Sequence, residues 1–79
     1  MPRKNITKDH IPLLVEIGSK LKEIRETKKT SIQEMAEDLK MSRNGYALME
    51  KGQIYFNFST LLSILDKLDI DYSDFFKDL

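Results

Sequence analysis

Few side chains in this sequence have the types and spacing that catalysis or metal binding requires. The chain has one histidine, His10, no cysteine, and no G-x-S-x-G, P-loop or H-E-x-x-H motif. The aspartates from Asp69 to Asp74 resemble the start of a calcium loop. However, Asp74 stands where that loop needs glycine, and its twelfth position falls beyond Leu79. We therefore expect no enzyme activity, no metal site and no cofactor.

Length and composition favour one small domain. The chain has 79 residues, of which 41% are hydrophobic and 33% are charged, and its formal net charge is zero. A chain of this size can bury only a small core. Because there is no cysteine, a disulfide framework is excluded and a reducing, cytoplasmic setting is favoured. No apolar stretch approaches the roughly 20 residues of a membrane span, so we expect a soluble protein without a membrane partner.

The spacing of apolar residues predicts five helices and no strand, an all-α fold. Residues 12–28 repeat apolar side chains at intervals of three and four, after a proline suited to the first turn of a helix. Residues 1–11 are expected to be a flexible N-terminal arm, and residues 12–79 one domain. The later helices are expected to be capped at their N-termini by Ser31, Ser42, Asn57 and Asp71.

Glycines mark where these helices end or approach one another. Gly52 is expected to end the third helix in a left-handed conformation. Gly18 lies inside the first helix, where it costs about 1 kcal/mol relative to alanine, so we expect a close neighbour at that turn. The second helix, at about 32–39, is joined to the third by only two or three residues. Two short helices with such a connection are typical of a helix-turn-helix.

Several segments have the residue types and spacing of one known family. They are Ile17-Gly18, Leu21, Ile24-Arg25, Ser31, Met35-Ala36, Met41-Ser42-Arg43, Glu50-Lys51-Gly52, Thr60-Leu61, Ile64, Leu68 and Asp74-Phe75-Phe76. In them, over about three quarters of its length, the chain resembles the phage-repressor and Cro-like helix-turn-helix family. The resemblance implies a lambda-repressor-like DNA-binding domain of five helices. It also implies a transcriptional regulator that binds a near-palindromic operator in double-stranded DNA as a homodimer.

The resemblance further implies which residues meet DNA. The helix that begins after Ser42 would lie in the major groove and read bases with Arg43, Asn44, Gly45 and Leu48. Arg43 can form two hydrogen bonds with guanine, and Asn44 can form two with adenine. The candidate phosphate contacts, which position the protein without reading sequence, are Lys40, Ser42, Lys51, Gln53, Asn57 and Ser59.

The chain departs from the family pattern at four positions in or near this helix. Ile32 stands where glutamine usually contacts the DNA backbone, so a phosphate contact is expected to be lost there. Lys40 replaces the turn glycine and would have to adopt a left-handed or otherwise strained backbone if the usual turn is kept. Gly45 offers no side chain to a base. Leu48 either touches a thymine methyl group or faces a protein.

These departures leave a second function open, in which the chain keeps the fold but does not read bases. Such a chain would be a protein-interaction module, for example an antirepressor or an accessory subunit. The single-domain length also resembles the controller proteins of restriction-modification systems, which dimerise through their last helices. This second resemblance predicts a narrower DNA-binding function, that of a restriction-modification controller protein. No small-molecule ligand is indicated.

The loop after Gly52 is unusually aromatic, whereas relatives have a polar loop with proline there. We expect Ile54 and Phe58 to lie in the core. The remaining aromatic side chains either fill gaps in a small core or form an apolar surface for self-association. In the second case the candidate dimer interface consists of Tyr55, Phe56, Tyr72, Phe76 and Leu79.

The zero net charge hides an uneven distribution. Residues 1–30 hold eight lysines and arginines against four acidic residues, whereas residues 31–79 hold five against nine. Five of the aspartates lie in residues 61–79, on the end that the resemblance places away from DNA. We expect Glu50 to be paired inside the protein, so that Lys40, Arg43 and Lys51 leave the surface that faces DNA positive. This distribution of charge therefore predicts few contacts with DNA phosphates and a DNA affinity that depends on dimerisation.

Overall fold

The computed structural model describes residues 7–55, 57–77 and 79, and within these ranges it contains helices and no strand. The elements are a 3₁₀ turn, η1 (Lys8–His10), followed by α1 (Ile11–Thr27), α2 (Ile32–Asp38), α3 (Arg43–Glu50), α4 (Phe58–Lys67) and α5 (Tyr72–Lys77). The predicted all-α, five-helix fold is therefore confirmed. Of the predicted N-terminal arm, residues 1–6 lie outside the described residues, and Ile11 already belongs to α1.

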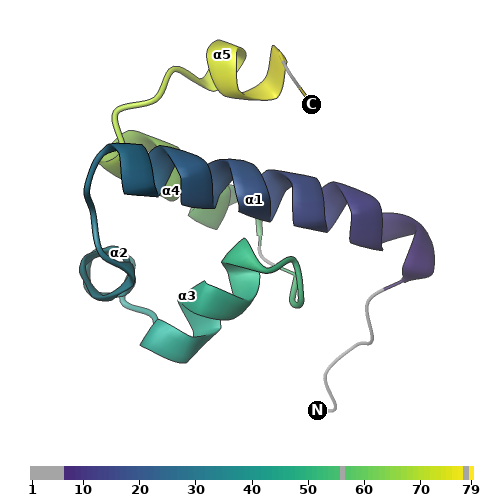
Figure 1. The fold of residues 1–79 in the computed structure, drawn as a ribbon, viewed down its shortest axis with the longest axis horizontal. Coiled ribbons are helices and arrows are strands. Elements are labelled where there is room, and N and C mark those ends of the chain that lie inside the picture. The colour runs from purple at the N-terminus through teal and green to yellow at the C-terminus, as the bar shows by residue number, and fades with distance from the viewer. Residues whose placement is uncertain (1–6, 56, 78) are drawn as a thin grey trace.

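The long helix α1 organises the molecule (Figure 1). The helix α4 lies behind it, α5 lies on one side, and α2 and α3 lie on the opposite side. The C-terminal helix α5 is thus separated by α1 from the two short helices that form the candidate site.

The four predicted N-caps are all present. The Ser31 hydroxyl accepts a hydrogen bond from the Glu34 amide at 3.0 Å, and the Glu34 carboxylate accepts one from the Ser31 amide at 3.3 Å, which completes a capping box. The other three caps accept from the amide three residues later: Ser42 from Gly45, Asn57 from Thr60 and Asp71 from Asp74. These local bonds fix where α2 to α5 begin.

Four helices end in the same way, with one residue in the left-handed conformation. The φ angles at these positions are 56° for Lys29, 56° for Lys40, 70° for Gly52 and 57° for Asp69. The next amide donates to the carbonyl five residues earlier, as Met41 does to Ala36 at 2.9 Å. The prediction for Lys40 is therefore confirmed. A side chain in this conformation costs about 1 kcal/mol, which only Gly52 avoids.

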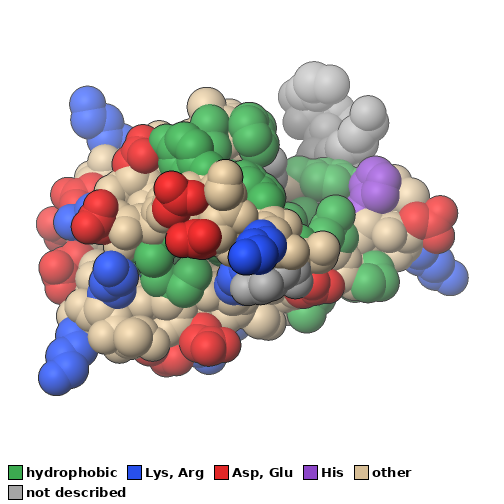
Figure 2. Space-filling model, turned by 90° about the horizontal axis from the view of Figure 1, so that it is seen from above, with side chains coloured by type: hydrophobic (Ala, Val, Ile, Leu, Met, Phe, Trp, Pro, Cys, Tyr) green, Lys and Arg blue, Asp and Glu red, His purple; other side chains and the backbone are tan. Residues whose placement is uncertain are grey.

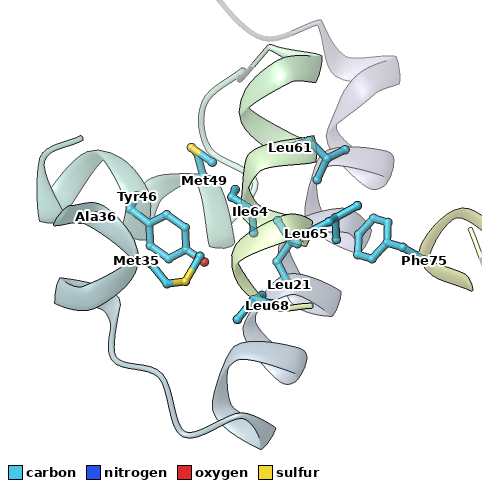
Figure 3. Close-up of a cluster of buried hydrophobic side chains, with 10 residues drawn as sticks. All are labelled: Leu21, Met35, Ala36, Tyr46, Met49, Leu61, Ile64, Leu65, Leu68 and Phe75. Carbon is cyan, nitrogen blue, oxygen red and sulfur yellow. The ribbon is translucent and has the colours of Figure 1, made fainter. Parts of the chain in front are cut away.

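All five α-helices contribute side chains to one core, which packs α2 and α3 against α1, α4 and α5 (Figure 3). In the close-up, Tyr46 and Met35 occupy the helix-turn-helix side, Leu21 and Leu65 lie near the middle, and Phe75 enters from α5. The buried hydrophobic residues are Leu21, Met35, Ala36, Tyr46, Met49, Leu61, Ile64, Leu65, Leu68 and Phe75. Burial of such side chains contributes about 1.5–3 kcal/mol each, so this small cluster dominates the stability.

Polar contacts attach the outer helices at their edges. The Lys20 ammonium donates to the Phe75 carbonyl at 2.7 Å and lies 4.9 Å from the centroid of the Phe75 ring. These contacts attach α5 to α1. On the other side, Lys67 of α4 pairs with Asp38 of α2. This pair is exposed and contributes little to stability.

The glycine at position 18 lets α3 approach the backbone of α1. A Cβ atom at Gly18 would lie 2.4 Å from the Glu50 carbonyl oxygen and 2.7 Å from that of Met49. These are backbone atoms, so they cannot move aside without moving the end of α3. The close neighbour that the sequence predicts at this turn is therefore the C-terminus of α3.

Replacing Gly18 with alanine is expected to lower the free energy of unfolding by about 1–3 kcal/mol, because the added methyl group forces the two helices apart. Urea denaturation measures this change. The matched control is Glu16→Ala on the exposed side of α1, which should stay within about 0.5 kcal/mol of the parent. Equal stability of the two variants would contradict the close approach.

The prediction that Phe58 lies in the core is wrong, whereas Ile54 does pack against the core. Phe58 is 63% exposed, and its ring stacks on that of Phe76 with centroids 6.0 Å apart. Helical spacing places Phe58 on the same face of α4 as Leu61 and Leu65. However, Phe58 is the first residue of the helix, and stacking on the half-buried Phe76 leaves most of its side chain exposed.

Candidate nucleic-acid interface

The candidate interface consists of α2, the turn at Lys40 and Met41, and α3. The capping box at Ser31 begins α2, the left-handed Lys40 follows its end, and Ser42 caps α3 two residues later. Both helices lie on the side of α1 away from α5 (Figure 1). This arrangement presents the N-terminal turn of α3 at the surface, as the helix-turn-helix geometry requires.

The base-reading candidates occupy the outer side of α3. Arg43 and Asn44 are exposed in its first turn, and Gly45 and Leu48 are half-buried. The inner side of α3 consists of Tyr46, Met49 and Glu50, all buried. The guanidinium of Arg43 and the amide of Asn44 are therefore both accessible to a base edge, with Leu48 one turn after Asn44 on the same side.

The phosphate candidates are all exposed, but several of their polar atoms already have partners inside the protein. The exposed residues are Lys40, Ser42, Lys51, Gln53, Asn57 and Ser59. The Ser42 oxygen accepts the Gly45 amide at 2.9 Å, which leaves its hydroxyl hydrogen free to donate. The Ser59 hydroxyl donates to the Asn57 Oδ1 at 2.9 Å. Ser59 would have to give up this bond in order to donate to a phosphate.

A buried ion pair fixes the C-terminal end of α3 against α1. The Arg25 Nε donates to Glu50 Oε2 at 2.7 Å, and its Nη2 donates to Glu50 Oε1 at 3.1 Å. A third bond runs from Arg25 Nη1 to the Thr30 carbonyl at 2.8 Å, in the segment that leads into α2. The hydrogen bonds with Glu50 raise the pKa of Arg25, against the opposing effect of burial. Arg25 therefore connects α1, the start of α2 and α3.

The prediction that Glu50 is paired internally is confirmed by this geometry. With both carboxylate oxygens bonded to Arg25, Glu50 does not offset the positive charges of Lys40, Arg43 and Lys51 on the outer side. Sequence reasoning did not identify Arg25 as its partner. The sequence did indicate that Arg25 is buried, because Arg25 follows Leu21 by four residues and so lies on the apolar face of α1.

Tyr46 lies beside the ion pair, with its ring in the core. Among the described residues its hydroxyl has no hydrogen-bond partner within ordinary geometry. Burial is the main cause that raises the pKa of Tyr46 well above its usual range, and the nearby Glu50 carboxylate adds to the effect. Tyr46 is therefore a neutral core residue of α3, and its role is to hold the helix by packing.

The candidate dimer residues lie in different surroundings. Phe76 is half-buried between Phe58 and Phe75, and the exposed Tyr72 hydroxyl donates to an Asp66 carboxylate oxygen. Leu79 is 39% exposed, and Phe56 lies outside the described residues. Figure 2 views the molecule from the α5 side and shows hydrophobic side chains gathered among acidic ones.

Tyr55 has a separate contact with the segment before α1. Its hydroxyl accepts the Thr7 amide at 3.1 Å and lies 2.5 Å from the His10 Nδ1 atom. No local pattern predicts this pairing, because His10 and Thr7 are 45 and 48 positions away from Tyr55. The contact attaches η1 to the loop between α3 and α4, close to the phosphate candidates Gln53 and Asn57 in sequence.

Among the described residues, no group of three or more His, Cys, Asp or Glu side chains could hold a metal ion. None of the described helices is long and apolar enough to cross a membrane.

Comparisons with known proteins agree with this geometry. A family profile described as a helix-turn-helix domain matches residues 18–78. A search of the curated proteins finds no match. Among solved structures, the restriction-modification controller protein C.AhdI from Aeromonas hydrophila is similar, with a TM-score of 0.76 and 28% sequence identity, over 85% of this chain and 97% of that chain. The chain therefore belongs to the helix-turn-helix domain family of DNA-binding transcriptional regulators.

Proposed function

We propose that this regulator reads a specific operator with α3 in the major groove. The observation that carries the proposal is the exposure of Arg43 and Asn44 in the first turn of a helix whose other side is buried and bonded to α1. A helix held in this way can present two side chains to base edges in one orientation. Arg43 would select guanine, Asn44 would select adenine, and Leu48 would contact a thymine methyl group.

Phosphate contacts would set the register of α3 without reading sequence. Lys40 lies two residues after the end of α2, and Lys51 directly follows α3. The Ser42 hydroxyl lies at the N-terminal end of α3, where the helix dipole favours an anion. Gln53, Asn57 and Ser59 would contribute from the loop and the start of α4. Gly45 has no side chain, and its amide already donates to the Ser42 oxygen, so it would let DNA approach α3 closely without reading a base itself.

The protein would bind as a homodimer, with the two α3 helices in successive major grooves about 34 Å apart. The apolar surface of Phe58, Tyr72, Phe76 and Leu79 supports this proposal, because a 63% exposed phenylalanine that stacks on a second ring is suited to a protein contact. The similarity to C.AhdI supports a narrower role, the control of a restriction-modification system, in the cytoplasm. Of the other candidate residues, Tyr55 contacts Thr7 and His10 through its hydroxyl, and Phe56 lies outside the described residues.

A selection from random duplexes at low salt tests operator binding. We expect one near-palindromic motif to be enriched, and its affinity to fall steeply as salt rises. If no motif is enriched by dimeric protein, the base-reading proposal fails. The chain would then be better described as a protein-interaction module that keeps this fold.

Replacing Arg43 with alanine tests the placement of the reading helix. The variant is expected to lose about 1–3 kcal/mol of binding free energy and its preference at one base pair of each half-site. Competition gel shifts with operators changed one base pair at a time measure both effects. Because Arg43 is exposed, the free energy of unfolding should not change. An unaltered preference at every position would contradict the proposal.

A further inference from the structure

A surface hollow of about 310 Å³ lies where α1, α2 and α3 meet. Its lining consists of Ser19 and Lys22 from α1, Ile32 from α2, and Ala47, Glu50 and Lys51 from α3. Ala47 follows Arg43 by one turn of α3, so the hollow borders the candidate base-reading surface. A DNA strand that passes α3 would therefore run close to it.

The charge of the hollow is positive. Lys22 and Lys51 are exposed, and within the described ranges neither ammonium group has an ion-pair or hydrogen-bond partner. The Glu50 carboxylate also lines the hollow, but both of its oxygens accept hydrogen bonds from Arg25. Its charge is thus compensated from within, which leaves the charges of Lys22 and Lys51 available to an anion from outside.

The residue at position 32 gives the hollow its shape. Ile32 is half-buried and packs against the core, so it offers an apolar wall and no hydrogen-bond donor. The related family usually has glutamine at this position as a contact to the DNA backbone. Here the donors around the same place are the Lys22 and Lys51 ammonium groups and the Ser19 hydroxyl. These groups suit a phosphate, because lysine binds it as a point charge and serine can donate one hydrogen bond.

We propose that Lys22 and Lys51 hold one backbone phosphate of the operator in this hollow. Lys22 would supply from α1 the contact that Ile32 cannot make from α2. The inference rests on the proposed function, since it requires α3 to lie in the major groove. It adds a third helix, α1, to the DNA-binding surface.

The test uses the full chain, the selected operator and the variant Lys22→Ala. Each lost phosphate contact should reduce the slope of log affinity against log salt by about 0.9 for each subunit bound. The loss should be the same for operator and unrelated duplexes, since a phosphate contact does not read sequence. The matched control is Lys77→Ala, an exposed lysine on α5, whose salt slope should equal that of the parent.

Neutral methylphosphonate linkages, placed one at a time in the operator, locate the phosphate. The parent should lose affinity at one linkage of each half-site where Lys22→Ala shows no further loss. An unchanged salt slope in Lys22→Ala, or equal sensitivity of both proteins at every linkage, would overturn the inference while operator binding stands. Failure to enrich any operator would overturn the proposed function and this inference together.

Discussion

Replacing Arg25 with methionine is expected to lower the free energy of unfolding by about 3–5 kcal/mol. Glu50 is buried, and the change leaves its carboxylate without either of its two bonds from Arg25. It also removes the bond to the Thr30 carbonyl. A domain of this size has about 5–15 kcal/mol of stability, so the variant loses a large share of it.

Urea denaturation followed by circular dichroism measures the effect. The control is Arg43→Met, which removes an exposed arginine and should leave the stability within about 0.5 kcal/mol of the parent. The double variant Arg25→Met, Glu50→Leu should be more stable than Arg25→Met alone, because no unpaired charge remains buried. If Arg25→Met and Arg43→Met were equally stable, the ion pair would not hold α3 against α1.

Replacing Phe58 with glutamate is expected to weaken operator binding by about 10²–10⁴-fold, because a monomer loses the gain from linking two half-site contacts. Phe58 is 63% exposed, so the substitution should leave the fold intact. It places a charge in the apolar surface that also contains Phe76. Sedimentation equilibrium should show a monomer at concentrations where the parent is a dimer.

A second variant locates the interface. Leu13 is 52% exposed on α1, and Leu13→Glu should leave both dimerisation and operator affinity as they are in the parent. If Leu13→Glu were monomeric and Phe58→Glu dimeric, the interface would lie on α1 instead. Operator affinity equal to that of the parent in a monomeric Phe58→Glu would show that dimerisation is not needed for binding.

The sequence by itself determined where most helices begin and end. Ser31, Ser42, Asn57 and Asp71 cap helices through bonds to amides three residues away, so their effect can be predicted from spacing. The left-handed Gly52 was predictable because glycine, which has no Cβ atom, adopts this conformation without steric cost. The left-handed Lys40 was expected only because the resemblance fixes the length of the turn.

Only the tertiary structure decided which side chains meet across the helices. The spacing of α4 places Phe58 on its apolar face, yet the fold leaves that end of the face uncovered and the ring exposed. Arg25 and Glu50 are 25 positions apart, and nothing local to either residue identifies the other. The hollow beside Ile32 likewise exists only because three helices converge there. Local hydrogen bonds depend on a few consecutive residues, whereas packing, ion pairing and exposure depend on how the whole chain folds.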